Sequence, residues 1–146
     1  MLKLNLPELP VRVKVEDNVE KIFDPIRKKW LLLSPEEWVR QYFLLFMHHV
    51  YKYPLSLAET EKKFDLFNTI KRADIVFYNR ELNPQVIVEC KAPSVKLNKD
   101  VFDQLINYHM ALKAEYLIIT NGMEHYIFQF IKGKVKFLKE IPSYLD

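Results

Sequence analysis

The segment 34–51 constrains the fold most, because it predicts a helix that is apolar around most of its circumference. Ser34 fits the capping position, a proline follows at the first helical position, and Glu37 completes a capping box. From Trp38 the run WVRQYFLLFMHHVY offers little polar surface, and Pro54 ends it. Such a helix is stable when most of its surface is buried. We therefore expect it to pack into the core rather than lie on the surface.

The stretches that follow this helix predict an α/β fold. A second helix is expected over 99–113, with Asn98 as its cap and apolar residues at helical spacing. The short apolar strand 116–122 comes next, and a strand–helix–strand connection allows it to run parallel to the strand before the helix. The three strands expected between the two helices are Leu55–Glu61, Arg72–Tyr78 and Gln85–Cys90.

Both ends of the chain carry the pattern of a β-hairpin. Residues 11–24 alternate apolar and polar on either side of Glu-Asp-Asn, and 125–138 do so around a Lys-Gly turn. At 146 residues the chain is expected to form a single domain. Its predicted parts are an N-terminal extension (1–33), a core (34–122) and C-terminal strands (123–146).

Composition excludes several classes of site. The only glycines are Gly122 and Gly133, so neither a P-loop nor a G-x-G-x-x-G motif is present. A single cysteine, Cys90, rules out an intramolecular disulfide and a cysteine-based zinc cluster. The net charge of +3 is compatible with a polyanionic partner without requiring one. The first residues have no long apolar run, so we expect a cytoplasmic protein without a membrane partner.

Three charged residues stand beside apolar strands, where charges need partners. Glu89 and Lys91 end the run VIVECKAP (86–93), and Asp74 lies in the preceding strand. A strand has a period of two, so Glu89 and Lys91 share a face. If the two strands are neighbours, Asp74 and Glu89 converge at one end of the sheet. Two carboxylates suit Mg²⁺ or Mn²⁺, and a lysine beside them can act on a water or a phosphate.

The residues alone leave a plainer interpretation open. Glu89 and Lys91 can form an ordinary salt bridge, with Asp74 as a strand residue of no special role. The second helix adds Gln104 and Tyr108, which are one turn apart and can point an amide and a phenol toward the same end of the sheet. They can also be a rim residue and a core aromatic.

Taken together, these residues resemble the PD-(D/E)xK nuclease superfamily. More narrowly, the sequence is similar to the N-terminal domain of type I restriction enzyme R subunits and its small stand-alone relatives. The similarity covers about 22–130. Its carriers are LSPEEWVRQ (33–41), KRADIVFY (71–78), VIVECKAP (86–93), QLINY (104–108) and YLIITNG (116–122). The resemblance implies a restriction-endonuclease-like core of order α-β-β-β-α-β, with a mixed central sheet flanked by helices.

The resemblance also implies roles for individual residues. Asp74 and Glu89 would bind the metal together with the main-chain carbonyl of Cys90, and Lys91 would be the catalytic lysine. Gln104 and Tyr108 match the family's Q-x-x-x-Y element. Glu37 is a weaker candidate, because its capping role is the stronger interpretation. Glu59 and Glu61 are interpreted as strand-edge charges.

Two functions remain open at this point. The first is Mg²⁺- or Mn²⁺-dependent hydrolysis of DNA, for which other subunits of a restriction or DNA-processing system are candidate partners. The second is a catalytically silent module that binds nucleic acid or a restriction-system partner. Six basic residues are expected to contact phosphates, which position nucleic acid without reading its sequence. They are Lys62, Lys63, Lys71, Arg72, Lys96 and Lys99.

Overall fold

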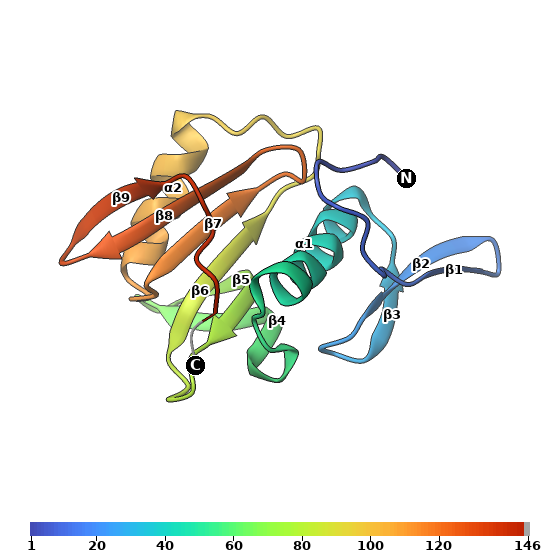
Figure 1. Cartoon of the computed structure of the whole chain (residues 1–146), viewed down its shortest axis with the longest axis horizontal. Coiled ribbons are helices and arrows are strands. Elements are labelled where there is room, and N and C mark those ends of the chain that lie inside the picture. The colour runs from blue at the N-terminus through green and yellow to red at the C-terminus, as the bar shows by residue number, and fades with distance from the viewer. Residues whose placement is uncertain (145–146) are drawn as a thin grey trace.

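Residues 1–144, which the computed structural model describes, form a large sheet, a small sheet and two helices (Figure 1). The helices are α1 (Pro35–Tyr51) and α2 (Lys99–Met110). The small sheet contains β1 (Val13–Glu16), β2 (Val19–Asp24) and β3 (Lys29–Leu32). The large sheet contains β4 (Ala58–Leu66), β5 (Thr69–Tyr78), β6 (Pro84–Cys90), β7 (Tyr116–Thr120), β8 (His125–Ile131) and β9 (Lys134–Leu138). The last two residues of the predicted C-terminal segment, 145–146, lie outside the described part.

The large sheet is mixed, as predicted. Its strands lie in the order β4-β5-β6-β7-β8-β9, and each neighbouring pair is antiparallel except β6 and β7. These two strands run parallel, and α2 lies between them in the sequence. A parallel pair needs such a crossover because the chain must return to the same end of the sheet.

The two helices cover opposite faces of the large sheet. Figure 1 shows α1 in front of the sheet and α2 behind it. In β6, Val86 and Val88 pack with residues of α1, whereas Ile87 packs in the cluster that includes residues of α2. This alternation follows from the period of two in a strand. It buries β6 on both sides and places Glu89 on the same side as Ile87.

Helix α1 begins where the sequence predicts it. The Ser34 hydroxyl accepts a hydrogen bond from the backbone N–H of Glu37 at 3.1 Å, which satisfies one free donor of the first turn. The helix ends at Lys52, whose φ of 69° is left-handed and whose N–H bonds back to the carbonyl of Met47. Among its buried residues is a charged one, Arg40.

The first strands of the large sheet differ from the prediction. The stretch Leu55–Leu57 forms a 3-10 turn, η1, and β4 continues five residues beyond Glu61. Strands β4 and β5 therefore form one long hairpin, whose turn residues Phe67 and Asn68 both have positive φ. That conformation matches the turn to the twist of the strands. The polar composition of the added residues hid this extension from pattern analysis.

The prediction was also wrong about the N-terminal hairpin and about the end of the second helix. The N-terminal region has a third strand, β3, which the prediction of a two-stranded hairpin omitted. The Asp24 carboxylate accepts hydrogen bonds from the backbone N–H groups of Ile26 and Arg27. These bonds stabilise a turn after β2, from which the chain returns as β3. Helix α2 ends at Met110 rather than at residue 113, because the chain turns there and Lys113 has a φ of 58°.

The first residues of the chain pack on the main body. Leu4 is buried, and the N–H of Asn5 donates to the carbonyl of Gly122 at 2.9 Å. The indole of Trp38 in α1 donates to the carbonyl of Leu2 at 2.8 Å. The N-terminal segment thus closes one edge of the core. None of the helices within residues 1–144 has the length and apolar character needed to span a membrane.

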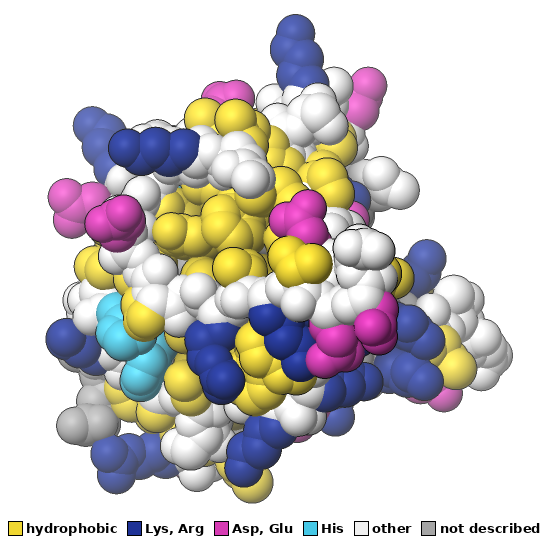
Figure 2. All heavy atoms as spheres, turned by 90° about the vertical axis from the view of Figure 1, so that its right-hand side faces the viewer, with side chains coloured by type: hydrophobic (Ala, Val, Ile, Leu, Met, Phe, Trp, Pro, Cys, Tyr) yellow, Lys and Arg dark blue, Asp and Glu magenta, His cyan; other side chains and the backbone are white. Residues whose placement is uncertain are grey.

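The small sheet stands at the side of the molecule. Its strand β2 contacts α1, and Ile22 of that strand is fully buried, while Val13, Val15 and Leu32 remain exposed. Figure 2 views the molecule from this side and shows a continuous apolar area with Lys and Arg side chains near it.

Candidate functional site

Asp74 and Glu89 lie side by side where β5 and β6 meet. The register pairs Ile75 with Val88, so the residues just beyond that pair are Asp74 and Glu89. The backbone N–H of Cys90 donates to the Asp74 carboxylate (Oδ2) at 2.7 Å. Lys91 follows at the end of β6, held by the bond from its own N–H to the carbonyl of Thr120 at 2.8 Å. The two carboxylates and the lysine that the sequence singled out are thus neighbours in space.

Both carboxyl groups of this pair are shielded from water. Burial raises the pKa of Asp74 to about 7, and the charge of Glu89 adds to the effect, although Arg40 opposes it. Burial likewise raises the pKa of Glu89 to about 7, against the stabilising influence of Lys91. Two like charges held together in a poorly solvated place resist joint ionisation. The pair therefore retains a proton near neutral pH unless a cation compensates for its charge.

His109 supports Glu89 from α2 and was missed in the sequence. Its Nε2 lies 3.0 Å from Oε1 of Glu89, and the ring is fully buried. Burial lowers the pKa of His109 to about 3, so the imidazole is neutral and Nε2–H donates to the carboxylate. A signal was available, because 109 lies four residues after Leu105 and therefore on the stripe of α2 that faces the sheet.

Arg40 of α1 connects the site to three other carboxylates and was also missed. Its Nη2 lies 3.0 Å from Oδ1 of Asp74 and 2.7 Å from Oε1 of Glu61. Its Nη1 lies 2.6 Å from Oε1 of Glu37, and Glu36 is at 3.6 Å from Nη2. Burial alone would lower the pKa of Arg40, but these carboxylates raise it. The signal was one arginine in a predominantly apolar helix, which implies buried partners.

Glu37 and Glu61 therefore have other surroundings than the sequence suggested. The backbone of Glu37 takes part in the cap with Ser34, but its carboxylate points to Arg40 and also accepts from the Gln41 amide at 3.2 Å. Glu61 lies on the edge strand β4, as predicted, but its side chain is only 26% exposed and is bonded to Arg40. Glu59, with 48% exposure, fits the description of a strand-edge charge.

Gln104 and Tyr108 share a hollow with Glu89 and Lys91. The hollow has a volume of about 220 Å³, and Lys71 and Arg72 of β5 complete its polar lining. The Tyr108 hydroxyl is buried without a hydrogen-bond partner among residues 1–144. A buried hydroxyl without a protein partner is uncommon and is available to donate a hydrogen bond to a bound group. The hollow thus combines a carboxylate, a lysine, an amide and a free phenol.

The predicted phosphate contacts divide into two groups. Lys71 and Arg72 line the hollow beside Glu89. The other four lie elsewhere: Lys62 is 3.5 Å from Glu59, Lys63 is exposed on the β4–β5 hairpin, Lys96 is exposed in the loop before α2, and Lys99 is paired with Asp103 at 2.7 Å. The structure therefore places the first group in the hollow beside Glu89, while Lys63 pairs with Arg72 across the β4–β5 hairpin.

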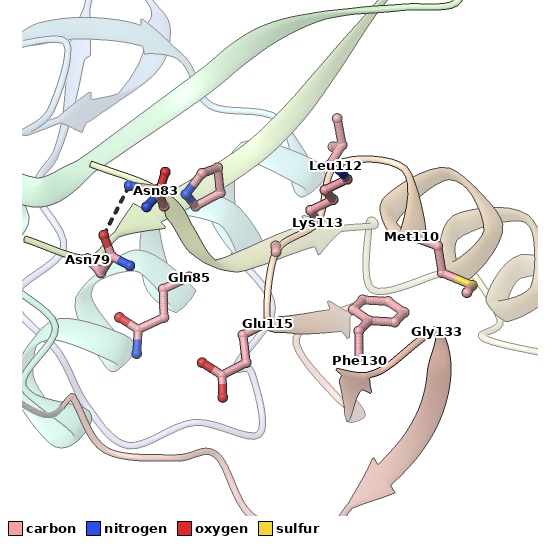
Figure 3. Close-up of a pocket in the computed structure, with 11 residues that line it drawn as sticks. Asn79, Asn83, Gln85, Met110, Leu112, Lys113, Glu115, Phe130 and Gly133 are labelled. Atoms are coloured by element: carbon pink, nitrogen blue, oxygen red, sulfur yellow. Dashed lines mark hydrogen bonds between the residues drawn. The ribbon is translucent and has the colours of Figure 1, made fainter. Parts of the chain in front are cut away.

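A larger hollow lies at the opposite end of β6 and is not part of this site. It has a volume of about 740 Å³, and its lining includes Asn79, Gln85 and Glu115 (Figure 3). Among residues 1–144, Glu115 is the acidic residue that lines it, and no carboxylate pair does. Size alone would select it, but its side chains do not provide the chemistry found around Glu89.

The donors around Asp74 fit a hard divalent cation that keeps part of its water shell. Within residues 1–144 no group of three or more His, Cys, Asp or Glu side chains has an arrangement that holds a metal by itself. Mg²⁺, however, is commonly bound by one or two carboxylates, with waters and substrate phosphates completing its six ligands. Asp74 and Glu89 meet that requirement, and a cation would compensate for the charge that burial makes unfavourable in both groups.

Comparisons with known proteins place this arrangement in context. A sequence model of the family described as the N terminus of the type I restriction enzyme R protein matches residues 35–142. No curated protein matches the sequence. Among solved structures, one described as a fragment of an HsdR subunit of a type I restriction enzyme from Vibrio vulnificus is similar at a TM-score of 0.40 and 23% identity. The match covers 60% of this chain and only 18% of that protein.

Proposed function

This chain belongs to the family of type I restriction enzyme R protein N-terminal domains, and from that premise we propose that it is a metal-dependent nuclease domain that acts on DNA. The proposal includes a core of the PD-(D/E)xK, restriction-endonuclease-like kind. The order α1-β4-β5-β6-α2-β7 around a mixed sheet supports it. DNA and further subunits of a restriction system are the proposed partners.

One observation carries the proposal: two buried carboxyl groups lie together beside a lysine at the end of an apolar strand. The shared surroundings raise the pKa of both acids to about 7. Burying two ionisable groups together lowers the stability of the fold. Groups with strongly shifted pKa values cluster at functional sites. A plain salt bridge between Glu89 and Lys91 would not require Asp74 to be buried with them.

Each residue has a role that suits phosphodiester hydrolysis. Asp74 and Glu89 would hold Mg²⁺ or Mn²⁺, with the main-chain carbonyl of Cys90 as a further ligand. When bound, such an ion stabilises negative charge on the phosphate and lowers the pKa of a coordinated water. Lys91 would hold the attacking water or a phosphate oxygen, and His109 would keep the Glu89 carboxylate in position. Gln104 and Tyr108 would orient the phosphate from α2.

Nicking of supercoiled plasmid DNA in Mg²⁺ or Mn²⁺ tests this function. We expect cleavage that stops in EDTA, and we expect Lys91→Ala to reduce the rate by about 100-fold or more while the protein stays folded, because a positioned acid–base group contributes that much. Lys139→Ala, which alters an exposed lysine away from the hollow, is the matched control. Cleavage at an undiminished rate in Lys91→Ala would refute the assignment.

A second candidate function is binding without catalysis. It is favoured by one feature: both oxygens of Asp74 already have protein partners, the Cys90 N–H and Arg40. A silent domain of this kind would bind DNA weakly and in a salt-dependent manner. It would bind no Mn²⁺ in calorimetry and cleave no DNA in any divalent cation, and Lys91→Ala would change neither result.

A further inference from the structure

Arg40 stands out among the groups that the proposed roles leave unused. It is a guanidinium with only 5% of its side chain exposed, and it lies within 3.0 Å of carboxylates from three different elements. These are Glu37 of α1, Glu61 of β4 and Asp74 of β5. A planar guanidinium can bind several carboxylates at once from a fixed fork, which a lysine cannot do. Arg40 therefore sets the relative positions of these three elements next to the proposed metal ligand.

The backbone of Glu61 provides an independent sign that this contact is built in. Its φ is 55°, in the left-handed region, although the residue lies in the interior of a strand and is not a glycine. The ladder pairs Thr60 with Ile75 and Lys62 with Ala73, so Glu61 lies opposite Asp74. A residue with a branched or long side chain adopts this conformation at an energetic penalty, and such residues concentrate at functional sites. Here the conformation accompanies a carboxylate that contacts Arg40 at 2.7 Å.

The contacts of Asp74 show what Arg40 can do for it. One oxygen accepts from the N–H of Cys90 and the other from Arg40, so neither oxygen can turn away without losing a bond. Each carboxylate oxygen has two lone pairs and can still accept a cation. The two bonds thus fix the direction in which Asp74 offers its remaining lone pairs.

We propose that Arg40 is a positioning residue that orients Asp74 for cation binding, and that Glu61, through its left-handed backbone, holds Arg40 in place. This inference rests on the proposed function, since it assumes that Asp74 is a metal ligand. Arg40 acts through Asp74 and does not touch the cation. The fork geometry, rather than the positive charge alone, is the property required.

Mn²⁺ binding to the whole chain, measured by isothermal titration calorimetry without DNA, tests the inference. Arg40→Lys keeps the charge but cannot bond Asp74, Glu61 and Glu37 together. Glu61→Gln keeps an oxygen that accepts from Arg40, so the fold is preserved, but it loses the charge that holds the guanidinium. We expect both variants to bind Mn²⁺ roughly 10-fold more weakly or worse, which is usual when a group supporting a metal ligand is removed.

Glu59→Gln is the matched control, because it makes the same change two residues earlier in β4 at an exposed side chain. We expect its Mn²⁺ affinity to equal that of the wild type. Thermal unfolding of every variant shows that it is folded at the temperature of the titration.

The possible results separate the inference from the proposed function. Wild-type affinity in Arg40→Lys would overturn the positioning role, and tighter binding in that variant would mean that Arg40 competes with the cation. Wild-type affinity in Glu61→Gln would overturn the role of Glu61. A wild-type chain that binds no Mn²⁺ would overturn the proposed metal site and this inference together.

Discussion

Glu89 illustrates how one residue links stability to function. In the fold its carboxylate accepts from His109 and is largely removed from water, so burial disfavours its ionised form. Its pKa rises from 4.5 to about 7, which means that the folded state binds a proton that the unfolded state releases. The folded state is therefore at a disadvantage that begins above the unfolded pKa and is complete above the folded one. The buried Glu89 carboxyl group is therefore destabilising at neutral pH.

This leads to a prediction for Glu89→Gln in EDTA. The amide oxygen still accepts from His109, and the amide stays neutral at every pH, so it avoids the penalty of an ionised carboxylate in this poorly solvated place. We expect the variant to exceed the wild type in unfolding free energy by roughly 1–3 kcal/mol at pH 8, with the advantage shrinking toward pH 5. Urea unfolding at both pH values measures it. His109 contributes a pH dependence of the opposite sign, because its lowered pKa makes the folded state lose stability as the pH falls below 6.5 toward 3. His109 is present in both proteins, so its contribution cancels when the variant is compared with the wild type.

Two outcomes decide this prediction. Glu20→Gln, which alters an exposed glutamate of β2, should show no such pH-dependent difference. If Glu89→Gln has the same advantage at pH 5 as at pH 8, the carboxyl group does not carry the raised pKa that its surroundings imply.

Among the elements, the turn between β7 and β8 shows how backbone and packing combine. Gly122 has a φ of 85°, and a Cβ there would approach Leu4 Cδ2 to 2.7 Å and Val39 Cγ2 to 3.1 Å. Gly133, in the turn between β8 and β9, has a φ of 76° but no heavy atom within 4 Å of a Cβ. The two glycines share a conformation and differ only in surroundings. The first turn must also accommodate the N-terminal segment and α1.

Alanine at each of these positions separates the two effects. We expect Gly133→Ala to lower the unfolding free energy by about 1 kcal/mol, the penalty of a left-handed alanine. Gly122→Ala should lower it by about 2–4 kcal/mol, because overpacking adds to the same backbone term. Chemical denaturation of both variants provides the comparison. Equal losses would mean that Leu4 moves aside freely and that the N-terminal segment is not firmly packed.

At the scale of the whole molecule, buried contacts join the small sheet to the large sheet. Ile22 of β2 is fully buried against the body. At the end of the same strand, the fully buried Asp24 accepts from the Thr60 hydroxyl of β4 at 2.7 Å and from Arg27 at 2.8 Å. These contacts join the N-terminal region to the strand that carries Glu61. They support the expectation that the whole chain is one cooperative unit.

Ile22→Ala tests this expectation. If the chain is one unit, the variant should unfold in a single transition with a free energy about 2–4 kcal/mol below that of the wild type, the usual effect of such a truncation. Val15→Ala on the same face of the small sheet, where Val15 is 70% exposed, should change it by less than about 0.5 kcal/mol. Thermal unfolding followed by circular dichroism and tryptophan fluorescence would reveal an independent small sheet as a second transition, with the main one unchanged.

Local patterns were sufficient for some features and not for others. The capping residue Ser34 and the apolar run after it located α1, and the period of two placed Glu89 and Lys91 on one face. Strand β3 and the extension of β4 were missed because much of each is polar or exposed. Strand β3 follows a turn with positive φ at Lys28, and the extension of β4 leads into a turn with positive φ at Phe67. Neither turn has glycine at these positions, and glycine is the residue that usually indicates a turn with positive φ.

The sequence by itself determined which segments are helices and core strands, and which acids and lysine stand beside apolar strand residues. These properties depend on residues a few positions apart, where periodicity and capping act. The tertiary structure alone decided that Arg40 and Glu61 meet at Asp74 and that His109 supports Glu89. Those contacts join residues on different elements that are between 20 and 34 positions apart, from the Glu89–His109 pair to the Arg40–Asp74 pair. They arise only when α1, β4, β5 and α2 pack around the same end of the sheet.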